Sequence, residues 1–219
     1  MPRWPPLELV TLQLEHLAPM LARPARELPR AGAWSFEFKY DGYRALCTRD
    51  QVRTRNGADA TAWFPEIPAA LTGLPAGHHV LDGEVSVLER GISNFALLHE
   101  RAKRRRWYPG APAVVFCAFD LLVHEGKDAR GLPIEERKAR LAPLVDGLPS
   151  VLFVSGIEDG RAAWAAVEAL RLEGVVAKRA GSVYVTGPSL DWLKIKRSGA
   201  ISELRRSTGL PGHFLAAWP

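Results

Sequence analysis

The residues best suited to chemistry lie early in the chain, in the segment Lys39-Tyr-Asp-Gly-Tyr-Arg44. Just before it, polar and aromatic residues alternate, which predicts a strand with Glu37 and Lys39 on one face. A lysine amine is a nucleophile when it is neutral, and burial or neighbouring positive charge lowers its pKa. With Glu37 on the same strand face and Arg44 close in sequence, Lys39 could lie in such a pocket, with its pKa lowered. Taken alone, so short a motif fits a surface hairpin with a charge pair equally well.

Four further segments follow, each on a predicted strand or at the end of one. They are Leu81-Asp-Gly-Glu84, Phe116-Cys-Ala-Phe-Asp-Leu-Leu122, Glu173-Gly-Val-Val-Ala-Lys178 and Trp192-Leu-Lys-Ile-Lys196. Glu84 ends an alternating strand, where its carboxylate can accept hydrogen bonds from hydroxyl groups, and its apolar flanks disfavour a solvated glutamate. Lys194 and Lys196 are two residues apart in a strand, so both ammonium groups point to one side and can neutralise a phosphate.

Together, the five segments resemble the catalytic motifs of the covalent nucleotidyltransferase superfamily, which contains ATP-dependent DNA ligases, RNA ligases and mRNA capping guanylyltransferases. The resemblance covers roughly residues 20 to 197. Three other segments resemble bacterial DNA ligases of the end-joining type: Met20-Leu-Ala-Arg-Pro24, Arg55-Asn-Gly-Ala-Asp-Ala-Thr61 and Trp63-Phe-Pro-Glu66. Five motifs in the family's order point to a ligase adenylation domain more specifically than any one motif does.

The resemblance implies a site for ATP. Lys39 would form a lysyl-AMP phosphoramidate and expel pyrophosphate. Phe119 would stack on the adenine, with Phe116 as a competing candidate, and Glu37 would read the amino edge of the purine. Glu84 would bind the ribose hydroxyls.

The resemblance also implies a phosphate and metal site. Arg44 would contact the nucleotide sugar and the phosphate of a DNA nick, and Arg55 would contact DNA or phosphate. Glu173 would position Mg²⁺ or Mn²⁺, with a surface glutamate as the alternative reading. Lys178 would be a further phosphate contact, and the two lysines of the last motif would contact the α-phosphate.

The spacing of periodic segments predicts an α+β fold with largely antiparallel sheets flanked by helices. The resemblance narrows this to the covalent nucleotidyltransferase fold, which is ATP-grasp-like. Helices are expected over 65–71, 93–101, 134–145 and 161–172. Strands are expected over 35–39, 44–49, 51–55, 80–88, 113–122, 151–154, 175–179 and 192–196.

Three regions are expected along the chain. Residues 1–33 are proline-rich and predict an irregular arm packed on the domain, residues 34–197 the adenylation domain, and residues 198–219 a C-terminal tail. The tail is too short for the five-stranded oligonucleotide-binding (OB) fold that follows this domain in ATP-dependent DNA ligases. We therefore expect a separately encoded OB-fold domain or end-joining proteins as partners, with slow self-adenylation without them. The segment before Trp192 lacks the arginine common in end-joining ligases, which removes one expected nucleic-acid contact.

Composition agrees with a globular protein that binds a polyanion such as nicked duplex DNA. The chain has 219 residues, a net charge of +5, 47% hydrophobic and 24% charged residues, which excludes a disordered or fibrous chain. No apolar stretch has the length of a signal peptide or transmembrane helix, so we expect a protein of the bacterial cytoplasm that is associated with the nucleoid and not with a membrane. We also expect a monomer. The basic run Arg101-Ala-Lys-Arg-Arg-Arg106 is expected either to contact duplex phosphates or to form a solvated face.

Three functions follow from these observations. The first is an ATP-dependent DNA ligase core that transfers AMP from a lysine to the 5′-phosphate of nicked DNA during repair. The second is an RNA ligase or capping-type nucleotidyltransferase, against which the segments beginning at Arg55 and Trp63 argue. The third is a nick-binding module with degraded ligase activity, which the intact Lys39, Glu84 and Glu173 disfavour.

Overall fold

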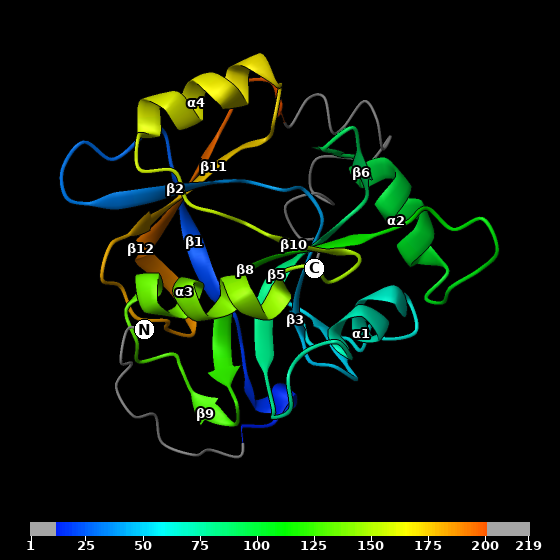
Figure 1. Cartoon of the computed structure of the whole chain (residues 1–219). Coiled ribbons are helices and arrows are strands. Elements are labelled where there is room, and N and C mark those ends of the chain that lie inside the picture. The colour runs from blue at the N-terminus through cyan, green and yellow to red at the C-terminus, as the bar shows by residue number, and fades with distance from the viewer. Residues whose placement is uncertain (1–11, 201–219) are drawn as a thin grey trace.

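The computed structural model describes residues 12–200, which form two facing sheets with helices on their outer sides (Figure 1). The first sheet has the order β10-β8-β5-β3-β4, with β9 paired to β8, and the second has the order β1-β12-β11-β2. The strands of the first sheet are β3 (Tyr43–Cys47), β4 (Val52–Thr54), β5 (Val80–Ser86), β8 (Val115–His124), β9 (Lys127–Asp128) and β10 (Val151–Phe153). Those of the second are β1 (Met20–Ala25), β2 (Trp34–Phe38), β11 (Gly174–Arg179) and β12 (Gly187–Lys196). A small hairpin joins β6 (Leu88–Glu89) and β7 (Ile92–Ser93).

The pairing within both sheets is largely antiparallel. Parallel pairs occur only between β1 and β12 and between β10 and β8 among the strands of residues 12–200. The helices are η1 (Leu14–His16), α1 (Glu66–Leu71), α2 (Phe95–Lys103), α3 (Ile134–Val145) and α4 (Gly160–Ala169). The predicted α+β fold with largely antiparallel sheets is confirmed.

Local signals explain where the longer helices begin and end. Helix α3 begins directly after Pro133, carries acidic residues in its first turn, and is followed by Gly147 at a positive φ of 71°. Helix α4 begins after Asp159, whose side chain accepts the backbone N–H of Arg161 and of Ala162. Helix α2 is capped by Asn94 in the same way. None of the helices in residues 12–200 is long and apolar enough to cross a bilayer.

Three apolar clusters fill the layers. One lies between the first sheet and α1, α2 and α3, and another lies between the second sheet and α4. The third lies between the two sheets, where Met20, Leu46, Leu122 and Trp192 are buried together. The two sheets therefore pack against each other through this apolar cluster. Both sheets contribute side chains at the edge of the cluster.

Strand β1 lies in the region that was expected to be an irregular arm. Its residues Met20–Ala25 pair in parallel with β12, with a register shift between Ala22 and Arg23. Pro24 is tolerated because β1 is the edge strand of its sheet. The prediction of an irregular segment is therefore wrong for these six residues.

Candidate active site

Three strand ends bring Lys39, Glu173 and Lys196 together. Lys39 directly follows β2, and its backbone N–H donates to the carbonyl of Gly174 over 2.9 Å. Its ammonium group forms an ion pair with one carboxylate oxygen of Glu173, the residue before β11. Lys196, the last residue of β12, pairs with the other carboxylate oxygen of Glu173 at 2.7 Å. The predicted nucleophile and the predicted metal carboxylate are thus direct neighbours.

Two glycines allow the backbone to approach closely enough for this arrangement. A Cβ at Gly42 would overlap the carbonyl oxygen of Val85 on β5. A Cβ at Gly174 would overlap the carbonyl oxygen of Ile195 on β12. The glycines of two sequence motifs are therefore required by the close packing of the Lys39 turn on β5 and of β11 on β12.

The carboxylates around Lys39 hold it in the charged form. Burial lowers the pKa of the Lys39 amine, but Glu173, Asp41 and Glu84 outweigh burial and raise that pKa above its usual value. Burial likewise opposes ionisation of Glu173, yet the charges of Lys39 and Lys196 keep the pKa of Glu173 low. The predicted lowering of the Lys39 pKa is wrong for this arrangement, because carboxylates and not cations are its nearest charged neighbours.

A second group of cations lies next to this ion pair. Burial lowers the pKa of Lys194, and the charges of Lys39, Lys196 and Arg55 lower it further. The Arg55 side chain is exposed, and its backbone N–H donates to the carbonyl of Arg44. Lys194, Lys196 and Arg55 thus form a positively charged surface beside Lys39, which suits phosphate oxygens.

Glu84 and Asp41 are carboxylates that titrate near neutrality. Burial, the largest influence, raises the pKa of Glu84 to about 7. Burial and the charge of Glu173 raise the pKa of Asp41 to about 6. Glu84 lies opposite Arg44 in the pairing of β5 with β3, and its charge acts on the Lys39 amine, so the predicted ribose acceptor and the predicted nucleophile belong to one site.

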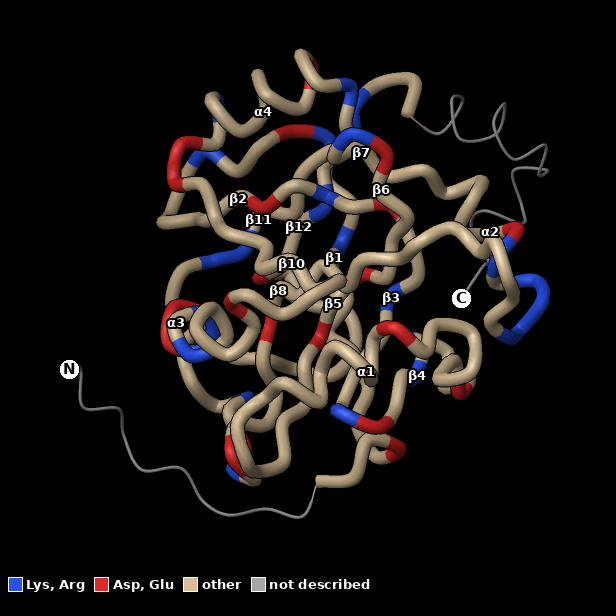
Figure 2. The backbone as a smooth tube through the Cα atoms, turned by 45° about the vertical axis from the view of Figure 1, so that its right-hand side comes forward, with Lys and Arg blue, Asp and Glu red and all other residues tan. Residues whose placement is uncertain are grey.

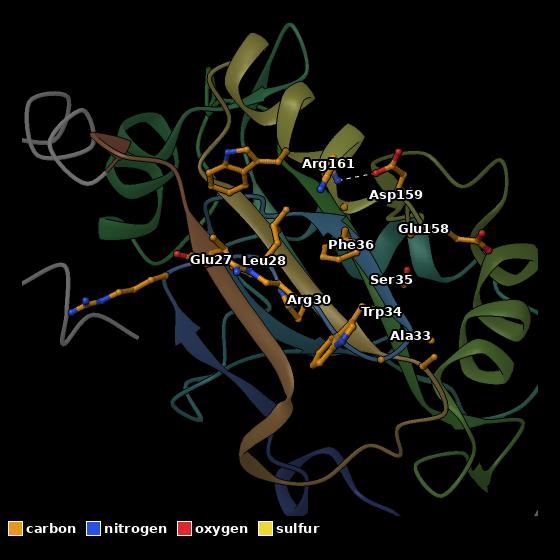
Figure 3. A pocket seen from close by; sticks show the side chains of 18 of the residues that line it. Glu27, Leu28, Arg30, Ala33, Trp34, Ser35, Phe36, Glu158, Asp159 and Arg161 are labelled. Atoms are coloured by element: carbon orange, nitrogen blue, oxygen red, sulfur yellow. Dashed lines mark hydrogen bonds and ion pairs between the residues drawn. The ribbon is translucent and has the colours of Figure 1, made fainter.

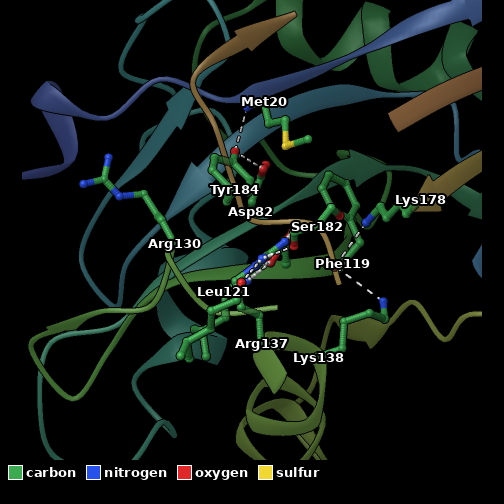
Figure 4. A network of polar contacts seen from close by, with 12 residues as sticks. Met20, Asp82, Phe119, Leu121, Arg130, Arg137, Lys138, Lys178, Ser182 and Tyr184 are labelled. Atoms are coloured by element: carbon green, nitrogen blue, oxygen red, sulfur yellow. Dashed lines mark hydrogen bonds and ion pairs between the residues drawn. The ribbon is translucent and has the colours of Figure 1, made fainter. Parts of the chain in front are cut away.

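Arg44 is clamped by Asp82, a residue that sequence reasoning did not select. Two Arg44 nitrogens donate to the Asp82 carboxylate over 2.5 and 2.6 Å, and its guanidinium lies 4.4 Å from the centre of the Phe119 ring. The hydroxyl of Tyr184 also donates to Asp82 over 2.5 Å and accepts the backbone N–H of Met20 (Figure 4). The sequence shows only an aspartate within the predicted apolar strand, and its full burial and its partner Arg44 are visible in the structure alone.

The ring of Phe119 is the better candidate for a stacking surface. Phe116 is fully buried in the cluster beneath the first sheet and contacts the position where Gly83 lacks a Cβ. Phe119 lies between the sheets, is partly exposed and forms an edge contact with Trp192 at 6.0 Å between ring centres. The alternative in which Phe116 stacks on a base is therefore excluded by its burial.

Glu37 and two lysines form a third group, and Figure 4 shows the two lysines, Lys138 and Lys178, beside Phe119. Lys138 of α3 donates to Glu37 over 2.6 Å, and Lys178 of β11 pairs with the other oxygen of Glu37 at 2.7 Å. The ammonium group of Lys178 lies 4.5 Å from the centre of the Phe119 ring. The structure thus places Lys178 with Glu37 and not with Lys194, in contrast to the expected phosphate contact. Lys138 was missed, and a single lysine in a helix gives no signal in the sequence.

The residues at Lys39 fit a divalent cation only in part. Across residues 12–200, no three His, Cys, Asp or Glu side chains are arranged as a metal cage. Mg²⁺, however, is commonly held by one or two carboxylates together with substrate phosphates. Glu173, whose two oxygens already bind cationic groups, fits that kind of donor set.

The basic run after α2 divides into two parts. Arg101 is fully buried and its guanidinium pairs with Glu66 at 2.6 Å, so it holds α2 against α1. Residues 103–107 are all exposed and form the basic turn visible at the end of α2 (Figure 2). The expected contact with duplex phosphates remains a prediction for this turn and is wrong for Arg101.

A separate hollow of about 1390 Å³ lies on the outer side of the second sheet (Figure 3). Trp34, Phe36, Arg161 and Trp164 are among its lining residues. Lys39, Glu84 and Glu173 do not line it, since it lies at the beginning of β2 and Lys39 lies beyond the end of that strand. The hollow is therefore not the site described above.

Comparisons with known proteins agree with these observations. A family model described as ATP dependent DNA ligase domain matches residues 19–196. The chain is 38% identical to the multifunctional non-homologous end joining protein LigD of Pseudomonas aeruginosa over 190 residues, which are 83% of this chain and 22% of that protein. It is 31% identical to the SPbeta prophage-derived DNA ligase-like protein LigB of Bacillus subtilis over 82% of this chain and 67% of that protein.

Solved structures give the same result. A structure described as mycobacterial DNA ligase D complexed with ATP and MES has a TM-score of 0.75 at 33% identity, over 85% of this chain and 62% of that chain. A Chlorella virus DNA ligase-adenylate has a TM-score of 0.60 at 17% identity, which shows a shared fold. The chain spans about a quarter of the length of the LigD relatives that it matches.

Proposed function

Because this chain belongs to the family of ATP-dependent DNA ligase domains, we propose that it is the adenylation core of a ligase that seals nicked duplex DNA. One observation carries the proposal at the level of chemistry. Lys39 lies at the end of β2 in contact with Glu173, and Glu173 in turn binds Lys196. The proposed nucleophile and the proposed phosphate-binding cation thus both contact the same carboxylate, that of Glu173.

ATP is the nucleotide used by the family, and the three groups of side chains suit its three parts. The adenine stacks on Phe119 with its amino edge toward Glu37. Glu84 accepts hydrogen bonds from the ribose hydroxyls. The phosphates face Lys194 and Lys196.

The first reaction is attack of the Lys39 amine on the α-phosphorus of ATP. An N–P bond forms and the P–O bond to the leaving pyrophosphate breaks, while Lys194 and Lys196 neutralise the charge on the phosphate oxygens. The amine must lose a proton first, and the ion pair with Glu173 opposes that loss. Mg²⁺ or Mn²⁺ bound at Glu173 would supply positive charge against the triphosphate.

The later steps act on DNA. The AMP passes from Lys39 to the 5′-phosphate at the nick, and the 3′-hydroxyl of the nick then displaces AMP to form the phosphodiester. Arg44 and Arg55 contact the nick phosphates in this proposal, since the charge of Arg55 acts on Lys194 and the charges of Arg44 and Lys39 both act on Glu84. The LigD relatives are about four times longer than this chain, so most of their length lies outside the matched domain. The proposal therefore includes a partner for this chain, either an OB-fold domain or end-joining proteins.

A labelled-adduct experiment tests the proposal. The protein is incubated with ATP labelled in its α-phosphate and with Mg²⁺ or Mn²⁺, then run on a denaturing gel. We expect a labelled protein band in the wild type and in the Lys103→Ala control, whose lysine is exposed on α2, and no band in Lys39→Ala. Chelation of the metal should also remove the band.

Two results would contradict the proposal. One is a labelled band that survives in Lys39→Ala. The other is a wild-type protein that binds ATP but forms no adduct, alone or with an OB-fold domain supplied in trans. Sealing of a nick that already carries AMP tests the last step separately, because that substrate does not require adenylation of Lys39.

A further inference from the structure

Lys138 is a partly buried cation that joins the two sheets at the proposed base site. It extends from α3 and donates to the carbonyl of Val154 over 2.5 Å and to Glu37 over 2.6 Å. A longer contact of 3.4 Å reaches the carbonyl of Phe119. Its side chain is 13% exposed, and that of Glu37 is 3% exposed. One ammonium group therefore connects the Glu37 carboxylate to the backbone of the residue whose ring faces the base.

Glu37 retains acceptor capacity despite its two lysine partners. A carboxylate has about four lone-pair sites, and Lys138 and Lys178 use one on each oxygen. An ionised carboxylate accepts hydrogen bonds and cannot donate them. It can therefore bind the amino group of a 6-aminopurine, while it repels the oxygen of a 6-oxopurine.

Lys178 alone is a pH-dependent partner for the Glu37 carboxylate. Burial lowers the pKa of Lys178 to about 8, and the nearby charge of Lys138 contributes to that lowering, whereas Glu37 and Asp120 oppose it. Lys178 consequently loses its charge just above neutral pH. The second ammonium group, from Lys138, is then the partner that stabilises the carboxylate.

We propose that Lys138 is a positioning residue for base selectivity, which holds the Glu37 carboxylate in place as a hydrogen-bond acceptor beside Phe119 and so favours 6-aminopurine nucleotides. This inference rests on the proposed ATP site. Lys138 does not touch the Lys39 group in the structure, so its effect falls on recognition of the base and leaves the phosphate contacts in place.

Reversible binding of three nucleotides tests the inference on the full chain. Dissociation constants are measured by calorimetry for ATP, GTP and purine riboside triphosphate, which lacks the 6-amino group. The variants are Lys138→Met and Lys138→Gln, which remove the charge, and Lys138→Arg, which keeps it. Lys103→Met is the control, since Lys103 lies in an exposed pair with Glu100.

We expect the preference of the wild type for ATP over purine riboside triphosphate to fall about 10-fold in Lys138→Met and Lys138→Gln, the scale of a hydrogen bond to a charged group. Lys138→Arg and Lys103→Met should keep the wild-type ratio. A purely structural role would weaken all three nucleotides together and leave the ratios unchanged, and that result would overturn the inference, as would a wild type without preference for the amino group. Failure of the proposed function is a separate result, namely the absence of a covalent adduct, because reversible binding does not require one.

Discussion

The salt bridge between Asp120 and Arg137 gives the sharpest test of what holds the site in place. Both side chains are fully buried, and the two groups form a bidentate pair with distances of 2.7 and 2.9 Å. Arg137 also donates to the carbonyls of Leu132 and Ser182. The pair thus fixes α3 and the segment before β12 to strand β8 (Figure 4). Asp120→Ala removes the carboxylate and leaves the guanidinium buried without its counter-charge.

The expected loss follows from that burial. Removing one partner of a buried pair costs about 3 to 5 kcal/mol, because the remaining charge is not solvated. The backbone carbonyls still accept bonds from Arg137, which favours the lower end of that range. For a chain of this size, each kcal/mol corresponds to about 2 to 4 °C in Tm, so we expect a decrease of about 6 to 12 °C.

Urea unfolding followed by circular dichroism measures the free energy of unfolding directly. Glu100→Ala is the matched control, since its pair with Lys103 has side chains that are 66% and 52% exposed and should contribute less than about 1 kcal/mol. The double variant Asp120→Leu with Arg137→Met should recover part of the loss, because it leaves no unpaired charge. A loss below about 1 kcal/mol in Asp120→Ala would refute the reasoning.

Two further predictions concern titration and access. Burial raises the pKa of Glu84 from 4.5 to about 7, so its contribution to stability is fully present below pH 4.5 and is lost as the pH rises through 7. In urea unfolding, the free energy of unfolding of the wild type should fall by roughly 1 to 3 kcal/mol between pH 5 and 8.5 relative to that of Glu84→Gln. Parallel pH profiles for the two proteins would contradict this prediction. Cys47 and Cys117 are buried, and burial raises the pKa of both thiols. A thiol reagent at pH 8 should therefore react with them only slowly until urea unfolds the chain. Rapid reaction of the folded protein would argue against the burial of these two side chains.

The sequence predicted the elements that local signals define. Helix α3 has the expected bounds because Pro133 and Gly147 mark its two ends. Strand β1 was missed because Pro24 and the charged residues beside it hide any alternation. Its pairing with β12 joins residues that are more than 160 positions apart, and local periodicity contains no information on such a contact.

In the candidate site, too, some residues were predicted from the sequence and their partners were not. The family resemblance implied that Lys39 and Glu173 lie at one site, and the two side chains form an ion pair. The partners that hold the site residues were not predicted, because Asp82 and Lys138 act through contacts made only in the folded chain. The direction of the Lys39 pKa also required the structure, since it depends on how many carboxylates lie near the amine and not on which motif carries it.

The electrostatics around Lys39 explain why the proposed nucleophile stays protonated, and therefore unreactive, in this arrangement. Its positive charge and the negative charge of Glu173 stabilise one another, so the amine remains protonated. A neutral amine becomes favourable only when another cation takes its place at Glu173 or when nearby charge disfavours the ammonium. The triphosphate alone would have the opposite effect, because its negative charge favours the ammonium form. A positive charge must therefore arrive together with the nucleotide, and the adduct assay with and without divalent metal measures that requirement.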